Sequence, residues 1–144
     1  MRRFHRAKDK QEVIDKLFAN GKGPFSQIWQ IIVFATCLGY RLGRKEPLGE
    51  CDSSVAIPPS VFLNNCASWP GLGYLINLVE STDPHILNMD DSTDEKRILL
   101  LEQYANAGLS KIREELEGKD YSLDGIIQMI GEYLYNNKSE TDSI

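Results

Sequence analysis

The chain has 144 residues, of which 42% are hydrophobic and 26% are charged. This length and composition suit one compact domain with a buried core, and they exclude a wholly disordered chain. Eleven glycines and six prolines are close to average usage, which excludes collagen-like and low-complexity classes. Composition alone does not indicate a function.

The net charge of −5 conceals an uneven distribution along the chain. Residues 1–48 contain ten Lys and Arg against four acidic residues, a net charge of +6, whereas residues 49–144 carry a net charge of −11. Such polarity favours a basic face that meets an anionic partner. It also favours an acidic face that is solvated or that contacts a basic partner.

The sequence predicts a cytoplasmic protein that does not span a membrane. Residues 7–18 alternate charged and apolar side chains, where a secretory signal would have a continuous apolar run. The most apolar stretch, residues 28–38, has about half of the roughly 20 residues that a membrane helix needs. The three cysteines form no Cys-x-x-Cys pair, which fits a reducing compartment.

The first third of the chain predicts two helices. Apolar residues recur at helical spacing over residues 8–20, and Gly21 can close this helix. Residues 28–42 are apolar on nearly every side and end before Gly43. We therefore expect this second helix to lie at the centre of the core.

Three prolines and a glycine within residues 44–60 predict an irregular connection. A short helix is expected over residues 60–65, a turn at residues 69–71 and a core-facing helix over residues 71–81. The core-facing residues of that helix are expected to be Leu72, Leu75, Ile76 and Val79.

The clearest helix start follows the acidic residues 90–95, where Ser92 and Glu95 have the spacing of a capping box. We expect this helix to run to Glu117. Gly108 lies in its middle and costs about 1 kcal/mol relative to alanine, so it marks a close helix crossing or a kink.

A last helix over residues 123–135 and a polar, frayed tail over residues 136–144 complete the chain. The sum is an all-α fold, one compact domain of five or six helices over residues 1–135. A short extended segment at the N-terminus is compatible with this pattern. Because the helix of residues 28–42 is apolar around its circumference, Trp29, Phe34 and Tyr40 cannot all face one small core, which predicts a homodimer.

Few residues could support catalysis. The two histidines are His5 and His85, and no local motif joins Cys66 to His85 as a thiol and its base. The acidic residues 90–95 lack the glycine and the ligand spacing of a calcium loop, so helix capping explains them better. The sequence therefore predicts no catalytic residue, no metal site and no cofactor.

The basic residues of the first third suggest contact with DNA. If the first two helices form an antiparallel hairpin, the basic groups before the first helix and after the second share one surface. DNA phosphates are natural partners, because contacts from Lys and Arg supply most non-specific affinity. The candidate DNA-binding residues are Arg2, Arg3, Arg6, Lys8, Arg41, Arg44 and Lys45.

Several short motifs resemble one family of small accessory proteins. These motifs are Val33-Phe34-Ala35, Leu38-Gly39-Tyr40, Gly43-Arg44-Lys45-Glu46-Pro47-Leu48, Asp94-Glu95-Lys96-Arg97 and Glu102-x-Tyr104-Ala105-Asn106-x-Gly108-Leu109. Over residues 6–130 the chain resembles the DNA phosphorothioation-associated protein family, accessory type four. Members accompany bacterial dnd systems that replace a non-bridging phosphate oxygen of DNA with sulfur and that restrict unmodified DNA. The resemblance supplies no catalytic residues.

The resemblance implies an accessory protein of a DNA phosphorothioation and restriction system. The residues themselves favour a non-enzymatic role, with contact to DNA through the basic N-terminal face as the favoured mechanism. Two alternatives stay open. The first is an adaptor whose acidic helix, residues 90–117, docks on a protein subunit of the same system. The second is a transcriptional regulator of the ribbon-helix-helix type, in which residues 2–7 supply the strand that enters the major groove.

Overall fold

The structure is a computed structural model that describes residues 2–142, with the backbone alone described for Leu134 and beyond Tyr135. Within these residues the chain forms six α-helices, four short 3-10 turns and no strand, which confirms the all-α prediction. The helices are α1 (Gln11–Phe18), α2 (Ile28–Leu42), α3 (Pro59–Asn65), α4 (Trp69–Ser81), α5 (Asp91–Leu116) and α6 (Leu123–Asp142). The 3-10 turns are Lys8–Lys10, Ala19–Gly21, Ser53–Val55 and Pro84–Leu87.

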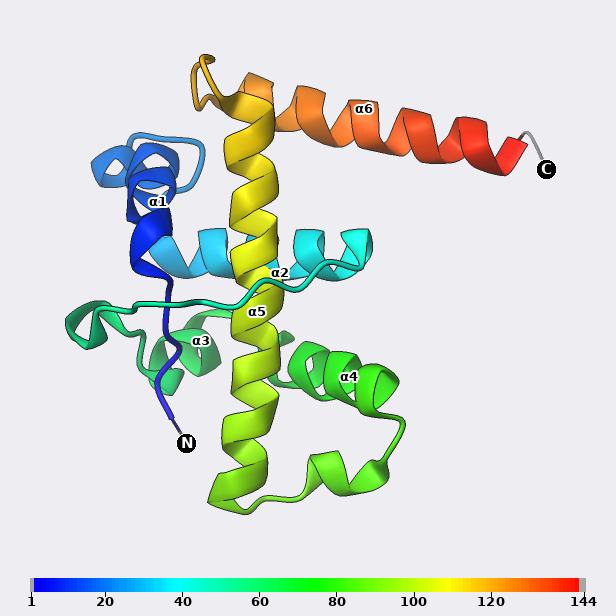
Figure 1. The fold of residues 1–144 in the computed structure, drawn as a ribbon. Helices are drawn as coiled ribbons and strands as arrows, with labels where there is room; N and C mark the ends of the chain where they lie inside the picture. The colour runs from blue at the N-terminus through cyan, green and yellow to red at the C-terminus, as the bar shows by residue number, and fades with distance from the viewer. Residues whose placement is uncertain (1, 143–144) are drawn as a thin grey trace.

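Helix α5 is the axis of the molecule. Helices α1, α2, α4 and α6 all contact it. Figure 1 shows α2 crossing one side of α5, while the connection between α2 and α3 crosses the other side. The longest helix is therefore enclosed on two opposite faces.

Two glycines bring the backbones of α2 and α5 together. A Cβ atom at Gly39 would fall on the backbone carbonyl of Tyr104, and a Cβ atom at Gly108 would fall on the carbonyl of Ala35. Only a residue without a side chain permits so close an approach. The prediction that Gly108 marks a close helix crossing is therefore confirmed.

The apolar core gathers around this crossing. As predicted, α2 is central, because Ile31, Ile32 and Ala35 are fully buried. Trp29 and Phe34 are partly buried and pack against the core, so they need no second copy to cover them. The homodimer stays a prediction.

The connection after α2, residues 44–58, is a strap across α5. The backbone N–H of Glu46 donates to the carbonyl of Gln103 (3.1 Å). Beyond it, Asn106 donates its side-chain amide to the carbonyl of Pro47 (3.0 Å). These bonds give the irregular connection a fixed path.

Residues 2–7 form an extended N-terminal arm that pairs with the end of the strap. Isolated antiparallel bridges join Phe4 to Ile57 and Ala7 to Cys51. A ribbon-helix-helix dimer needs this segment to pair with a second copy. Because the arm is paired within its own chain, the fold gives that alternative no support.

The first two helices do not form the expected antiparallel hairpin. Figure 1 shows α1 and α2 crossing at a steep angle, so that the C-terminal end of α2 lies on the opposite side of α5 from α1. The turn between them contains Ala19 and Asn20 in left-handed backbone conformations, with φ of 45° and 56°. The two basic groups of the sequence are therefore not brought to one end of a hairpin.

Helix α4 turns a different face inward from the one predicted. Ile76 is buried, but Leu75 and Val79 are 59% and 54% exposed. The polar Asn77 is buried in their place and donates its amide to the carbonyl of Arg97 (3.2 Å). A buried polar residue with a partner replaces the apolar stripe, which hydrophobic spacing alone does not indicate.

Two predicted features near helix starts are wrong. The N-cap of α5 is Asp90, whose carboxylate accepts a hydrogen bond from the backbone N–H of Thr93 (3.1 Å), so Ser92 does not cap the helix. The predicted turn at residues 69–71 is the first turn of α4. Pro70 is tolerated there because the first turn of a helix needs no backbone donor.

Helix α6 is longer than its apolar pattern predicts. Its backbone is helical from Leu123 to Asp142, whereas the prediction ends the helix at Tyr135. Residues 143–144, the end of the predicted tail, lie outside the described residues. The division into one domain and a tail stays a prediction. In the part of the chain that the structure describes, no helix has the length and apolarity needed to cross a bilayer.

We expect Gly39→Ala and Gly108→Ala to destabilise the protein strongly. Each added methyl group meets a backbone carbonyl of the other helix, and overpacking of this kind costs about 1–3 kcal/mol or more. That cost exceeds the gain of about 1 kcal/mol from replacing a mid-helix glycine with alanine. Urea unfolding followed by circular dichroism measures the change.

Gly131→Ala is the matched control, because a Cβ atom at this position of α6 has no neighbour within 4 Å. It should leave stability unchanged or raise it by about 0.5–1 kcal/mol. If all three variants behave alike, the close crossing does not govern stability.

Candidate functional site

Four of the seven predicted DNA-binding residues are paired with carboxylates of the same chain. The pairs are Arg2–Glu102, Lys8–Glu50 (3.4 Å), Arg44–Glu114 (3.3 Å) and Lys45–Glu80. Each pair offsets one positive charge that the sequence assigns to the basic face. The positive potential available to phosphates is correspondingly lower than the count of basic residues suggests.

The other three predicted residues have different surroundings. Arg6 is buried, and its guanidinium donates to the carbonyl of Val55 (3.0 Å). Arg3 is exposed and donates to the carbonyl of Ala56 (3.3 Å). Arg41 is exposed and forms no ion pair with any described side chain. Arg3 and Arg41 therefore keep their charges on the surface.

The Arg44-Lys45-Glu46-Pro47 motif fastens the strap to the rest of the fold. The ammonium group of Lys10, which is fully buried, lies 3.3 Å from one oxygen of Glu46, and the hydroxyl of Ser110 donates to the other. A buried ammonium group needs such a partner. Sequence reasoning missed Lys10, because nothing in its local pattern distinguishes it from the exposed Lys8.

A polar hollow lies beside this motif. Arg44 and Lys45 line it together with Arg113 of α5, which the sequence analysis did not single out. Arg113 also donates to the backbone carbonyl of Asp9 (3.2 Å). Glu46 and Glu114 line the same hollow, so its charges are mixed.

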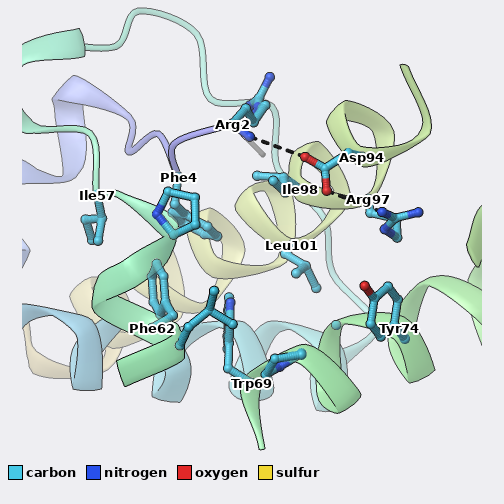
Figure 2. Close-up of a pocket in the computed structure, with 14 residues that line it drawn as sticks. Arg2, Phe4, Ile57, Phe62, Trp69, Tyr74, Asp94, Arg97, Ile98 and Leu101 are labelled. Atoms are coloured by element: carbon cyan, nitrogen blue, oxygen red, sulfur yellow. Dashed lines mark hydrogen bonds and ion pairs between the residues drawn. The ribbon is translucent and has the colours of Figure 1, made fainter. Parts of the chain in front are cut away.

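A separate, apolar cavity lies between the N-terminal arm and helices α3, α4 and α5 (Figure 2). Its volume is about 80 Å³. The residues that line it are Arg2, Phe4, Ile57, Pro59, Phe62, Leu63, Trp69, Pro70, Gly73, Tyr74, Asp94, Arg97, Ile98 and Leu101. Because these residues come from four separate segments of the sequence, no local motif indicated the cavity.

Aromatic rings form one wall of the cavity. The rings of Phe62 and Trp69 are stacked with their centroids 4.6 Å apart, and Phe4 of the arm packs on both at 5.7 and 6.1 Å. Figure 2 shows Phe62 and Trp69 on the side of the cavity opposite Arg2. Contacts of this geometry stabilise the wall beyond its apolar area.

Charged groups form the other side. Asp94 accepts a hydrogen bond from the backbone N–H of Arg2 (3.2 Å) and one from the guanidinium of Arg97 (3.3 Å), as Figure 2 shows. Arg97 also donates to the carbonyl of Ile86 (2.7 Å) and lies over the ring of Tyr74, 5.2 Å from its centroid. This network fixes the rim and joins it to the start of α5.

Apolar surface continues outside the cavity. Leu63 lines the cavity and is 48% exposed. The hydroxyl of Tyr74, on another part of the lining, lies 3.7 Å from the sulfur of Met89, which is 79% exposed. We call the cavity with Leu63, Tyr74 and Met89 the apolar site.

Glu102 of α5 binds the N-terminal arm through hydrogen bonds. Its side chain is fully buried and accepts hydrogen bonds from the guanidinium of Arg2 and the backbone N–H of His5. Burial raises the pKa of the Glu102 carboxyl, and the bonds from Arg2 and His5 oppose that shift only in part. The carboxylate is thus placed where its charge is costly.

The described residues offer little for catalysis. No group of three or more His, Cys, Asp or Glu side chains among them is placed to hold a metal ion. Burial raises the pKa values of the Cys37 and Cys51 thiols, which disfavours the nucleophilic thiolate form. His85 pairs with Asp83 (2.8 Å) on an exposed turn.

We expect the stability difference between the wild type and Glu102→Gln to depend on pH. A carboxyl whose pKa is raised in the folded state stabilises the fold fully below its unfolded value of 4.5, and that contribution is lost as pH rises through the folded pKa. The thermal midpoint of the wild type should therefore fall relative to that of Glu102→Gln as the pH rises above the unfolded value of 4.5. Melting curves followed by circular dichroism test this, and a constant or growing advantage of the wild type contradicts it.

Comparisons with known proteins identify the family of this chain. No curated protein and no solved structure matches the chain. The model of one family, described as DNA sulphur modification system-associated protein 4, matches residues 3–143. That match covers nearly the whole chain, including the strap, the α2–α5 crossing and all of the apolar site except Arg2. The chain therefore belongs to the family of DNA sulphur modification system-associated protein 4.

Proposed function

We propose that this protein is a non-enzymatic, cytoplasmic accessory protein that docks on a protein subunit of its DNA sulphur modification system through the apolar site. The composition of that site supports the proposal. Trp, Tyr, Phe, Met and Arg are the residues that protein interfaces concentrate at their centres, and all five types meet here. Single exposed apolar residues need no explanation, but this surface continues into a cavity.

The size of the cavity supports a side chain as its occupant. Cofactor and substrate sites have volumes of about 300–1,000 Å³. The cavity of about 80 Å³ is far smaller, and it is also smaller than the cavity of about 150 Å³ that binds benzene in an engineered protein. While the arm is in place, one aliphatic side chain of a partner, inserted between Leu63 and Tyr74, suits this space.

We expect Leu63→Lys to weaken binding of the partner subunit at least tenfold. The added charge would have to be buried against the partner, and truncating or charging a central contact costs about 2 kcal/mol or more. The measurement is isothermal titration calorimetry with each protein encoded beside the modification genes.

Val79→Lys is the matched control. Val79 has a similar exposure, 54% against 48% for Leu63, but it does not line the cavity. The Val79→Lys variant should bind the partner subunit with the affinity of the wild type. Equal losses in both variants, or wild-type affinity in Leu63→Lys, would show that docking does not use the apolar site.

Contact with DNA is a second candidate function. Arg44, Lys45 and Arg113 line one polar hollow, which favours an oxyanion such as a phosphate at that place. The carboxylates of Glu80 and Glu114 oppose it, because they already pair with Lys45 and Arg44. For this reason we rank it below protein docking.

Reversing the exposed charges at Arg3 and Arg41 tests the DNA candidate. If the basic residues contact phosphates, the affinity for duplex DNA should fall steeply as the salt concentration rises. The double variant Arg3→Glu, Arg41→Glu should bind duplex DNA more weakly than the wild type at the same salt concentration, with an unchanged thermal midpoint. Fluorescence anisotropy with a labelled duplex measures both. Absence of binding at low salt excludes direct contact with DNA.

A further inference from the structure

The N-terminal arm occupies its groove in the manner of a bound peptide. The backbone N–H of Phe4 donates to Ile57 (2.8 Å), and the N–H of Ile57 donates back (2.9 Å). Side chains at alternate positions face inward, since Arg2 and Phe4 line the cavity and Arg6 is buried. Backbone pairing with pockets for alternate side chains is how domains bind an added strand.

The fit of the arm is incomplete. Among the described residues, five buried side-chain polar atoms lack a hydrogen-bond partner: Arg2 Nε, His5 Nδ1, Arg6 Nε, Arg6 NH1 and Asn106 Oδ1. Four of the five belong to the arm, and Asn106 lines a small hollow together with His5 and Arg6. Each of these atoms is buried without a hydrogen bond, although His5 Nδ1 lies 3.4 Å from a carboxylate oxygen of Glu102. The loss of their bonds to water offsets part of the gain from burying Phe4.

The arm also has a natural point of detachment. Lys10, just beyond it, is anchored by Glu46, and Lys8 donates its backbone N–H to Glu50 (2.8 Å). Before Lys8, the arm is held by its bridges, by Asp94 and Glu102, and by hydrogen bonds from Arg3 and Arg6 to strap carbonyls. Because the carbonyl of Ala7 accepts from the backbone N–H of Lys10 (3.1 Å), detachment that leaves α1 in place is expected for residues 2–6.

We propose that the arm is an autoinhibitory segment, and that its groove binds an extended segment of a partner protein that carries an arginine and an aromatic residue two positions apart. This inference rests on the proposed function, because the groove contains the cavity of the apolar site. The arm blocks the groove by presenting the same chemistry within the chain. Binding of the partner segment displaces it.

The chemistry of the groove defines this occupant. The carboxylate of Asp94 lines the cavity together with the Phe62 and Trp69 rings, and the carboxylate of Glu102 accepts a hydrogen bond from the guanidinium of Arg2. The backbone of Ile57 supplies a donor and an acceptor for an extended chain. A segment with a cationic side chain at one position and an aromatic ring two positions later satisfies all three features, as Arg2 and Phe4 do.

The direct test supplies the arm as a separate peptide. The full chain with Arg2→Ser and Phe4→Ser should release its own arm, and a fluorescein-labelled Arg-Arg-Phe-His-Arg-Ala peptide should bind this variant at least tenfold more tightly than the wild type. A peptide with serine in place of phenylalanine should bind neither protein. Lys22→Ser, at an exposed position outside the arm, should behave as the wild type. If the variant keeps its helical circular dichroism and does not prefer the peptide, the proposal is overturned.

Hydrogen exchange on the wild-type protein provides a second test, which holds even if the double variant fails to fold. The amides of Phe4 and Ile57 should exchange together and at least tenfold faster than those of buried residues in α5. Equal protection of arm and α5 overturns the proposal. Both tests need only this chain, whereas the Leu63→Lys titration needs a partner, so failure of the docking function and failure of the arm are distinguishable.

Discussion

The contact between the backbones of α2 and α5 determines how the rest of the molecule is arranged. Gly39 and Gly108 remove the side chains that would hold the two helices apart, so the helices meet carbonyl to glycine at two points. The tight crossing centres the core on Ile31 and Ile32. It also leaves the opposite face of α5 for the strap and the N-terminal arm, and it thereby sets the position of the apolar site.

The face of α5 that contacts α2 is held by close packing, whereas the opposite face, which contacts the strap and the N-terminal arm, is held by polar interactions. Lys10, Glu46 and Ser110 form one partly buried cluster, and Arg2 and Glu102 form another. Ion pairs that include a buried charge contribute little net stability, because desolvation offsets their attraction. Their value is positional, since each fixes a chain segment that has no regular secondary structure. No buried side-chain polar atom of the strap lacks a hydrogen-bond partner among the described residues, whereas the arm has several that do.

The sequence predicted the positions of the helices better than it predicted the contacts between residues far apart in the chain. The span of α2 and the role of Gly108 follow from local patterns, because apolar periodicity and a glycine in a helix have direct structural causes. The ion pairs do not follow, since Arg2 and Glu102 are one hundred positions apart in the chain. Counting basic residues therefore overstated the positive surface. The cavity was missed for the same reason, because its walls come from segments that only the fold brings together.

The spacing of the two glycine contacts limits how this chain can change in length. On α5 the contacts fall at Tyr104 and Gly108, and on α2 they fall at Ala35 and Gly39, four residues apart in both helices. One inserted or deleted residue between either pair would rotate one contact away from the other by about 100°. Length variation among relatives should therefore be absent between these positions and should collect in the strap and in the turn before α6.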